Sequence, residues 1–83
     1  MVAGIPGAEH ARSAELAEAL QRLNPRMRHV VTRRFGLDGE APQTLEEVGN
    51  DLGITRERVR QLETRALREL RIVAPALQFY LQQ

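Results

Sequence analysis

The sequence contains no cysteine and no tryptophan, and its aromatic residues are two phenylalanines and one tyrosine. Without thiols, the chain can form no disulfide, no thiolate metal site and no cysteine nucleophile. Because aromatic side chains are scarce, the core of this chain of 83 residues must be built from aliphatic side chains, which suits packed helices. One small all-α domain is therefore predicted.

Long hydrophobic runs are also missing. No stretch of about 18 apolar residues is present, and no charged start precedes the apolar core of a secretion signal. We therefore expect a cytoplasmic protein without a membrane segment. The sequence has no catalytic triad arrangement, phosphate-binding glycine loop or H-E-x-x-H motif, and His10 and His29 have no partner at metal-ligand spacing. A protein without enzymatic activity, metal or cofactor is expected.

Lysine is absent, so all 12 basic residues are arginines. A genome biased toward arginine codons explains this, although arginine also has the forked donors that suit phosphate and guanine. The net charge of +1 does not by itself indicate a nucleic-acid binder. The charges fall in blocks, however, with +4 in residues 24–36, −5 in residues 37–54 and +3 in residues 55–71. If the two basic blocks pack side by side, their potentials add on one face.

Helix start and stop signals divide the first half of the chain. Residues 1–12 show no clear hydrophobic period and include glycine and proline, so we expect a flexible segment there. A regular apolar stripe after Ser13 predicts the first helix. Asn24 is a favourable cap, and the proline that follows it suits the first helical position, so a second helix is expected from Pro25. Gly36 can adopt the left-handed conformation that ends this helix.

Further capping signals predict a third and a fourth helix. Thr44 begins a Thr-x-x-Glu capping box at the start of the third helix. Gly53 can end that helix, and Thr55 can cap the fourth, which should stop by about Ala74 because a proline follows. Two capped helices joined by a short turn with glycine are typical of a helix-turn-helix, here in residues 44–71.

The spacing inside this segment fits a helix-turn-helix. Val48 is expected to face Val59, Gly49 is small where the two helices must approach, and Ile54 would fill the angle between them. Gly53 can take the positive φ that the turn needs. The alternative is an ordinary helical hairpin, in which Gly49 is incidental and Gly53 is a simple helix end.

The exposed side of the fourth helix favours a DNA-binding function. Arg56 can pair with guanine, Glu57 can accept from the amino group of cytosine, and Gln61 can bridge adenine. An arginine in the first turn of a helix lies at the unfavourable end of the helix dipole, which indicates an external anionic partner. On the second helix, Arg26 and Arg34 can point away from the apolar stripe, and we expect both to contact phosphate.

Three segments carry a family resemblance: RRFGLDG at 33–39, TLEEVG at 44–49 and GITRERVRQLETRALRELR at 53–71. They resemble region 4, the C-terminal promoter-recognition domain of the sigma-70 family of bacterial RNA polymerase sigma factors, in particular housekeeping-type members. The resemblance covers residues 14–71, and we expect the domain to span residues 13–73. It implies a four-helix, monomeric domain that binds the −35 promoter element as duplex DNA while docked on the flap tip of the polymerase β subunit.

The resemblance also implies roles for individual residues. Those that resemble the base-reading residues are Arg56, Glu57 and Gln61. Those that resemble residues meeting the DNA backbone or orienting the contact are Arg26, Arg34, Leu45, Glu46, Thr55, Arg58 and Arg60. Those similar to the segment that transcription activators touch are Arg65, Arg68 and Arg71. The flap-facing groove is expected around Phe35, Leu37 and Leu70.

The chain departs from the family pattern after Arg71, because an apolar tail at residues 74–83 replaces the usual polar and charged continuation. A short C-terminal helix that folds back on the core would explain the tail, and so would an exposed docking segment for another protein. The upstream domains that bind the core enzyme and melt the −10 region are also missing. The chain is therefore expected to be either an excised domain or a free-standing relative.

Two other functions stay open. One is a stand-alone helix-turn-helix regulator that dimerises on a palindromic operator, for which only the apolar tail offers a dimer face. The other is a sigma-like fragment whose main partner is an anti-sigma or regulator protein that covers the DNA-binding face.

Overall fold

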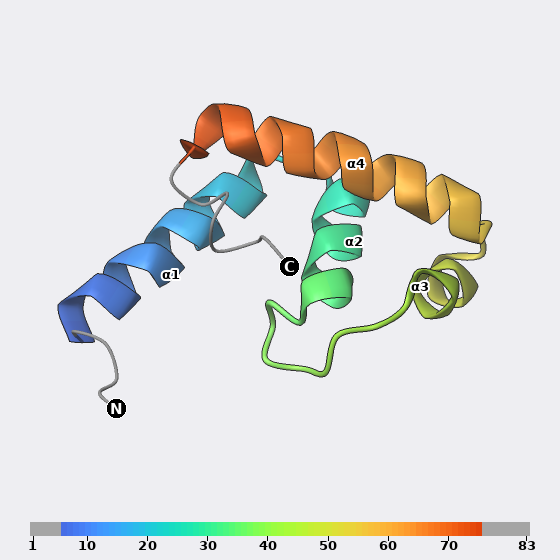
Figure 1. The fold of residues 1–83 in the computed structure, drawn as a ribbon, viewed down its shortest axis with the longest axis horizontal. Helices are drawn as coiled ribbons and strands as arrows, with labels where there is room; N and C mark the ends of the chain where they lie inside the picture. Colours follow the sequence, from blue (N-terminus) through green and yellow to red (C-terminus); the bar gives the residue numbers. More distant parts are fainter. Residues whose placement is uncertain (1–5, 76–83) are drawn as a thin grey trace.

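The computed structural model describes residues 6–75. The helices of this part are α1 (Pro6–Gln21), α2 (Pro25–Phe35), α3 (Leu45–Leu52) and α4 (Arg56–Val73). In Figure 1, α4 runs along the top of the view, with α3 beneath its N-terminal end, α2 beneath its middle and α1 near its C-terminal end. Residues 6–75 form helices and no strand, which confirms the predicted all-α, four-helix class.

The first helix begins earlier than predicted. α1 starts at Pro6, whereas the sequence predicted a start at Ser13 and a flexible segment over residues 1–12. Proline suits the first position of a helix, and the residues that follow are rich in alanine, the strongest helix former. The prediction missed this start because it depended on an apolar stripe, which these residues lack. The proposed helix or docking segment in the tail lies, from residue 76 onward, outside the described residues.

The core is aliphatic, as the composition predicted. It receives side chains from every described helix and from the turn between α1 and α2. Its buried members are Leu16, Ala19, Leu23, Met27, Val30, Val31, Val48, Val59, Leu62, Ala66 and Leu70. Among the described residues, no polar or charged side chain is fully buried. Since full burial of one large aliphatic side chain contributes about 1.5–3 kcal/mol, this cluster holds α4 against the other helices.

Local capping sets where the helices begin. Thr44 Oγ1 accepts a hydrogen bond from the amide of Glu47 at 3.1 Å, and the Glu47 carboxylate accepts from the amide of Thr44 at 2.8 Å. Asn24 and Thr55 cap α2 and α4 in a similar way, each accepting from the amide three residues later. These contacts satisfy helix amides that have no partner inside the helix. The predicted starts of α2, α3 and α4 are confirmed.

Glycines with positive φ end α2 and α3. Gly36 has a φ of 65° and Gly53 a φ of 71°, a conformation that glycine adopts without steric cost. After Gly53, the half-buried side chain of Ile54 packs against the core. The chain then turns into α4, so α3, the turn and α4 form the predicted helix-turn-helix.

Candidate nucleic-acid interface

The first two turns of α4 present the predicted base-reading residues to solvent. Arg56, Glu57 and Gln61 are all exposed. Val59, which lies between them in sequence, and Leu62, which follows Gln61, face the core, where they are 0% and 4% exposed. Burial of the three polar side chains inside the domain would have excluded a reading face, and the structure places them outside.

Neighbouring arginines hold two of these three side chains. Arg60 donates to both carboxylate oxygens of Glu57, from Nε to Oε1 at 3.0 Å and from Nη2 to Oε2 at 2.6 Å. Arg58 Nη1 donates to Oε1 of Gln61 at 3.2 Å. The hydrogen bonds from Arg60 lower the pKa of the Glu57 carboxyl and raise the pKa of the Arg60 guanidinium. Such exposed pairs contribute little to stability, but they restrict the orientation of both acceptors.

Arginines from α2 and α4 line a common groove of about 610 Å³. Arg26 comes from the first turn of α2, and Arg58 and Arg65 come from α4. The first turn of α2, which Asn24 caps, adds the partial positive charge of a helix N-terminus. The two basic blocks of the sequence thus meet on one surface, where an anionic ligand would experience both.

The groove is lined by only one of the three arginines that were expected to face an activator. The resemblance grouped Arg65 with Arg68 and Arg71, which are both exposed further along α4. The structure places Arg65 beside Arg58 in the groove and also in a second hollow with Gln61. Sequence spacing along α4 alone could not reveal this, because the groove depends on how α2 packs against α4.

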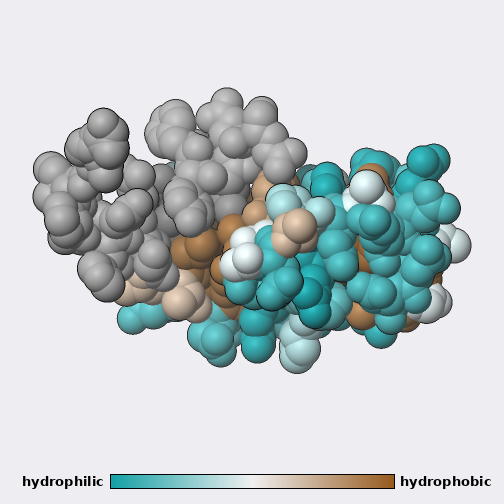
Figure 2. Space-filling view, turned by 90° about the horizontal axis from the view of Figure 1, so that it is seen from below, coloured by the Kyte–Doolittle hydropathy of each residue, from teal (hydrophilic) through white to brown (hydrophobic). Residues whose placement is uncertain are grey.

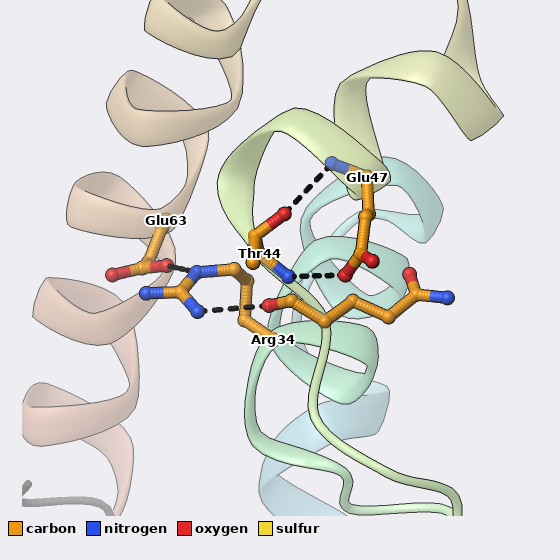
Figure 3. A network of polar contacts seen from close by, with 5 residues as sticks. Arg34, Thr44, Glu47 and Glu63 are labelled. Atoms are coloured by element: carbon orange, nitrogen blue, oxygen red, sulfur yellow. Dashed lines mark hydrogen bonds and ion pairs between the residues drawn. The ribbon is translucent and has the colours of Figure 1, made fainter.

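Arg34 points into the domain, which differs from its predicted place on an exposed phosphate-facing side. Its Nε donates to Oε1 of Glu63 at 2.6 Å, and its Nη1 donates to the carbonyl oxygen of Gln43 at 2.9 Å (Figure 3). The side chains of Arg34 and Glu63 are 21% and 18% exposed. Glu63 could not be recognised as a partner from the sequence, because it lies 29 residues from Arg34 and belongs to another helix.

The hydrophobic residues predicted to face the polymerase flap differ in exposure. Leu70 is 1% exposed and belongs to the core, so its side chain has no accessible surface for a partner. This corrects the prediction for Leu70, which continues the buried stripe of Ala66 one helical turn later. Phe35 and Leu37 are half-buried and pack against the core while keeping part of their surface exposed.

On the face shown in Figure 2, the side of α3 is mainly hydrophilic, whereas hydrophobic residues gather toward the middle. Leu45 at the start of α3 is half-buried against the core, and Glu46 and Thr55 are exposed.

Within the described residues, no helix has the length and apolar character needed to cross a membrane. In the same part of the chain, no three acidic or histidine side chains are placed to hold a metal ion.

The geometry of α3, the glycine turn and α4 defines a helix-turn-helix domain, with an exposed polar first turn on its second helix. Comparison with known families is more specific. The family model described as sigma-70, region 4, matches residues 19–71. The chain therefore belongs to the sigma-70 region 4 family, a non-enzymatic module of transcription initiation factors.

Similar proteins from several bacteria are themselves sigma factors, which supports this family assignment. The chain is 46% identical over 63 residues to the RNA polymerase principal sigma factor HrdD of Streptomyces coelicolor, covering 76% of this chain and 19% of that protein. It is 51% identical over 57 residues to sigma factor SigA of Clostridium acetobutylicum, covering 69% of this chain and 15% of SigA. It is 49% identical over 59 residues to sigma factor RpoD of Helicobacter pylori, covering 70% of this chain and 9% of RpoD. The chain thus spans less than a fifth of the length of these relatives.

Proposed function

We propose that this chain binds the −35 promoter element as duplex DNA, within RNA polymerase holoenzyme, during transcription initiation. One observation carries the proposal: Arg56, Glu57 and Gln61 are exposed together on the first two turns of the second helix of a helix-turn-helix. In this fold the N-terminal part of the second helix enters the major groove, where each base pair presents a distinct pattern of donors and acceptors.

Each of the three side chains suits a different base. Arg56 can donate two hydrogen bonds to O6 and N7 of guanine, Glu57 can accept from N4 of cytosine, and Gln61 can pair with N6 and N7 of adenine. Arg60 and Arg58 keep the acceptors of Glu57 and Gln61 oriented before DNA arrives. A protein whose base-contacting side chains are already ordered loses less conformational entropy on binding.

Phosphate contacts would come from the surface around these readers. Arg26, Arg58 and Arg65 line the groove beside the N-terminal end of α2 and can neutralise phosphates of one strand. Leu45, Glu46 and Thr55 lie at the starts of α3 and α4, where backbone amides can donate to phosphate oxygens. Such contacts set the register of the protein on the duplex without reading sequence.

Protein partners complete the proposal. The partly exposed surfaces of Phe35 and Leu37, at the end of α2, would dock on the flap tip of the polymerase β subunit. Arg68 and Arg71 would face an activator bound upstream. The proposed function implies a monomer, one domain per polymerase, and a cytoplasmic location.

A second candidate is a module whose main partner is a regulator or anti-sigma protein. Ile72 and Val73, at the end of α4, are 72% and 41% exposed, which favours a protein contact there. Under this candidate, the regulator would exclude promoter DNA from the chain.

Fluorescence polarisation with labelled duplexes tests the proposal. The chain should bind a duplex carrying a −35 element more tightly than a scrambled duplex, with weak and salt-sensitive affinity because the interface is small. Arg56→Ala should cost roughly 1–3 kcal/mol on the promoter duplex and reduce the preference for it. Arg22→Ala is the matched control, because Arg22 lies beside Val73 and Ala74, at the other end of α4. Equal binding of both duplexes by the wild-type chain would refute the proposal.

A further inference from the structure

Arg34 connects three parts of the helix-turn-helix region. It lies at the C-terminal end of α2, its Nε donates to Glu63 in the middle of α4, and its Nη1 donates to the backbone carbonyl of Gln43. Gln43 is also attached to α2 through its own amide, which donates to the carbonyl of Arg33 at 2.9 Å. The backbone amide and the backbone carbonyl of Gln43 therefore both hold the loop that leads into α3 against α2.

Gln43 immediately precedes the first residue of the α3 capping box. Thr44, the next residue, exchanges two hydrogen bonds with Glu47 and so sets the direction of the first turn of α3 (Figure 3). A displacement of Gln43 would move this turn together with its backbone amides. One guanidinium thus couples the start of α3 to α4, the helix that carries the reading face.

We propose that Arg34 and Glu63 form a positioning pair for DNA recognition. The pair keeps the start of α3 and the first turns of α4 at a fixed distance and angle, so that phosphate contacts and base contacts are made at the same time. This inference rests on the proposed function. It assigns Arg34 a role through other residues, in place of the direct phosphate contact that the sequence predicted.

Burial distinguishes this pair from the other ion pair of α4. The side chains of Arg34 and Glu63 are 21% and 18% exposed, whereas those of Arg60 and Glu57 are 55% and 60% exposed. A partly desolvated pair with a second hydrogen bond is geometrically stricter than an exposed one, and loss of one partner leaves the other charge uncompensated. The pair of Arg34 and Glu63 is therefore suited to hold geometry.

The bonds of Arg34 restrict how a phosphate could reach it. Its Nε donates to Glu63 and its Nη1 to Gln43, so a phosphate contact would have to use the remaining N–H groups of the guanidinium. A phosphate near Arg34 would also approach the negative charge of Glu63, which is unfavourable at short range.

The two roles predict opposite effects for Glu63→Gln. If Arg34 contacts phosphate, the substitution releases its guanidinium and removes a negative charge, so DNA binding becomes tighter. If the pair positions α3 and α4, the same substitution weakens promoter binding although the protein becomes more positive. The salt dependence of DNA binding provides a second distinction between the two roles. Each lost phosphate contact lowers the slope of log K against log salt by about 0.9, whereas loss of a positioning contact leaves the slope unchanged.

The experiment measures polarisation of promoter and scrambled duplexes across a salt series, using the whole chain. We expect Glu63→Gln to bind the promoter duplex roughly threefold to tenfold more weakly, with a wild-type salt slope and a reduced preference over the scrambled duplex. Arg34→Gln and the double variant should lose a similar factor, because the two residues act as one unit. The control is Glu69→Gln, which makes the same charge change at an exposed position of α4 and should bind as tightly as wild type or more tightly.

Arg34→Lys keeps the test decisive if Glu63→Gln fails to fold, as judged by circular dichroism and urea denaturation. Lysine keeps the charge but lacks the fork that reaches two acceptors, so this variant should lose promoter preference under the positioning role and keep it under the phosphate role. Tighter binding by Glu63→Gln, or a slope lowered by about one unit in Arg34→Gln, would overturn the inference. A wild-type chain without promoter preference would refute the proposed function itself, and the positioning role with it.

Discussion

The backbone of Gly49 lies directly against the carbonyl oxygen of Ile54, so close that a β-carbon at residue 49 would come within 2.7 Å of that oxygen. The same β-carbon would lie 3.5 Å from the Cγ2 atom of Val59. α3 and the turn into α4 therefore approach each other through backbone rather than through side chains. This close contact sets the angle at which α4 leaves the turn.

Gly49→Ala should therefore destabilise the domain. A methyl group at this position must displace backbone, and overpacking of this kind costs about 1–3 kcal/mol. Urea denaturation followed by circular dichroism measures the change in the free energy of unfolding. Asn50→Ala, at the neighbouring exposed position, should change it by less than about 0.5 kcal/mol. Equal stability of the two variants would show that the turn can open without cost.

The capping box of α3 gives a second prediction. Thr44→Ala removes the oxygen that accepts from the amide of Glu47, and loss of such a cap costs about 1 kcal/mol. Thr44→Ser retains the hydroxyl and should restore most of this stability. Thermal or urea unfolding distinguishes the two variants, and a serine variant as unstable as the alanine variant would contradict a capping role.

The assignment of Leu70 to the core is also testable. Leu70→Ala should lower the free energy of unfolding by about 2–5 kcal/mol, because it leaves a cavity among buried side chains. Ile72→Ala removes a similar side chain from a position that is 72% exposed and should have little effect on stability. If Leu70 were instead available to a protein partner, both variants would unfold at the same urea concentration.

The ion pair of Glu57 and Arg60 predicts how base discrimination depends on pH. The pair lowers the pKa of Glu57 below its ordinary value of 4.5, so the carboxylate stays charged above that value and loses its charge only as the pH falls through the lowered pKa. Discrimination due to Glu57 should therefore be constant between about pH 5.5 and 8.

Polarisation with matched and mismatched duplexes measures this discrimination for the wild type and for Glu57→Gln at each pH. The ratio between the two proteins isolates Glu57 from other groups that titrate in the same range. A ratio that collapses near the acidic end of the range would show that the carboxylate is protonated there and that the pair with Arg60 does not persist.

Signals within one or two helical turns made much of this domain predictable. Asn24, the Thr44 capping box and Gly53 were recognisable because a cap or a helix end depends on residues three or four positions apart. The exposed first turns of α4 were predictable for the same reason, since helical periodicity separates Arg56 and Gln61 from the buried stripe. The start of α1 was missed, because alanine-rich sequence forms a helix there without an apolar stripe.

By itself, the sequence determined the identity of the helix-turn-helix, its boundaries and the side chains exposed on the first turns of α4, because each depends on neighbours along the chain. Tertiary packing alone decided that Arg34 binds Glu63, 29 residues away, and that Arg65 joins Arg26 in one groove. The angle between α2 and α4 sets both relationships. That angle results from the simultaneous packing of many aliphatic side chains from different helices. No local pattern of residues specifies this packing.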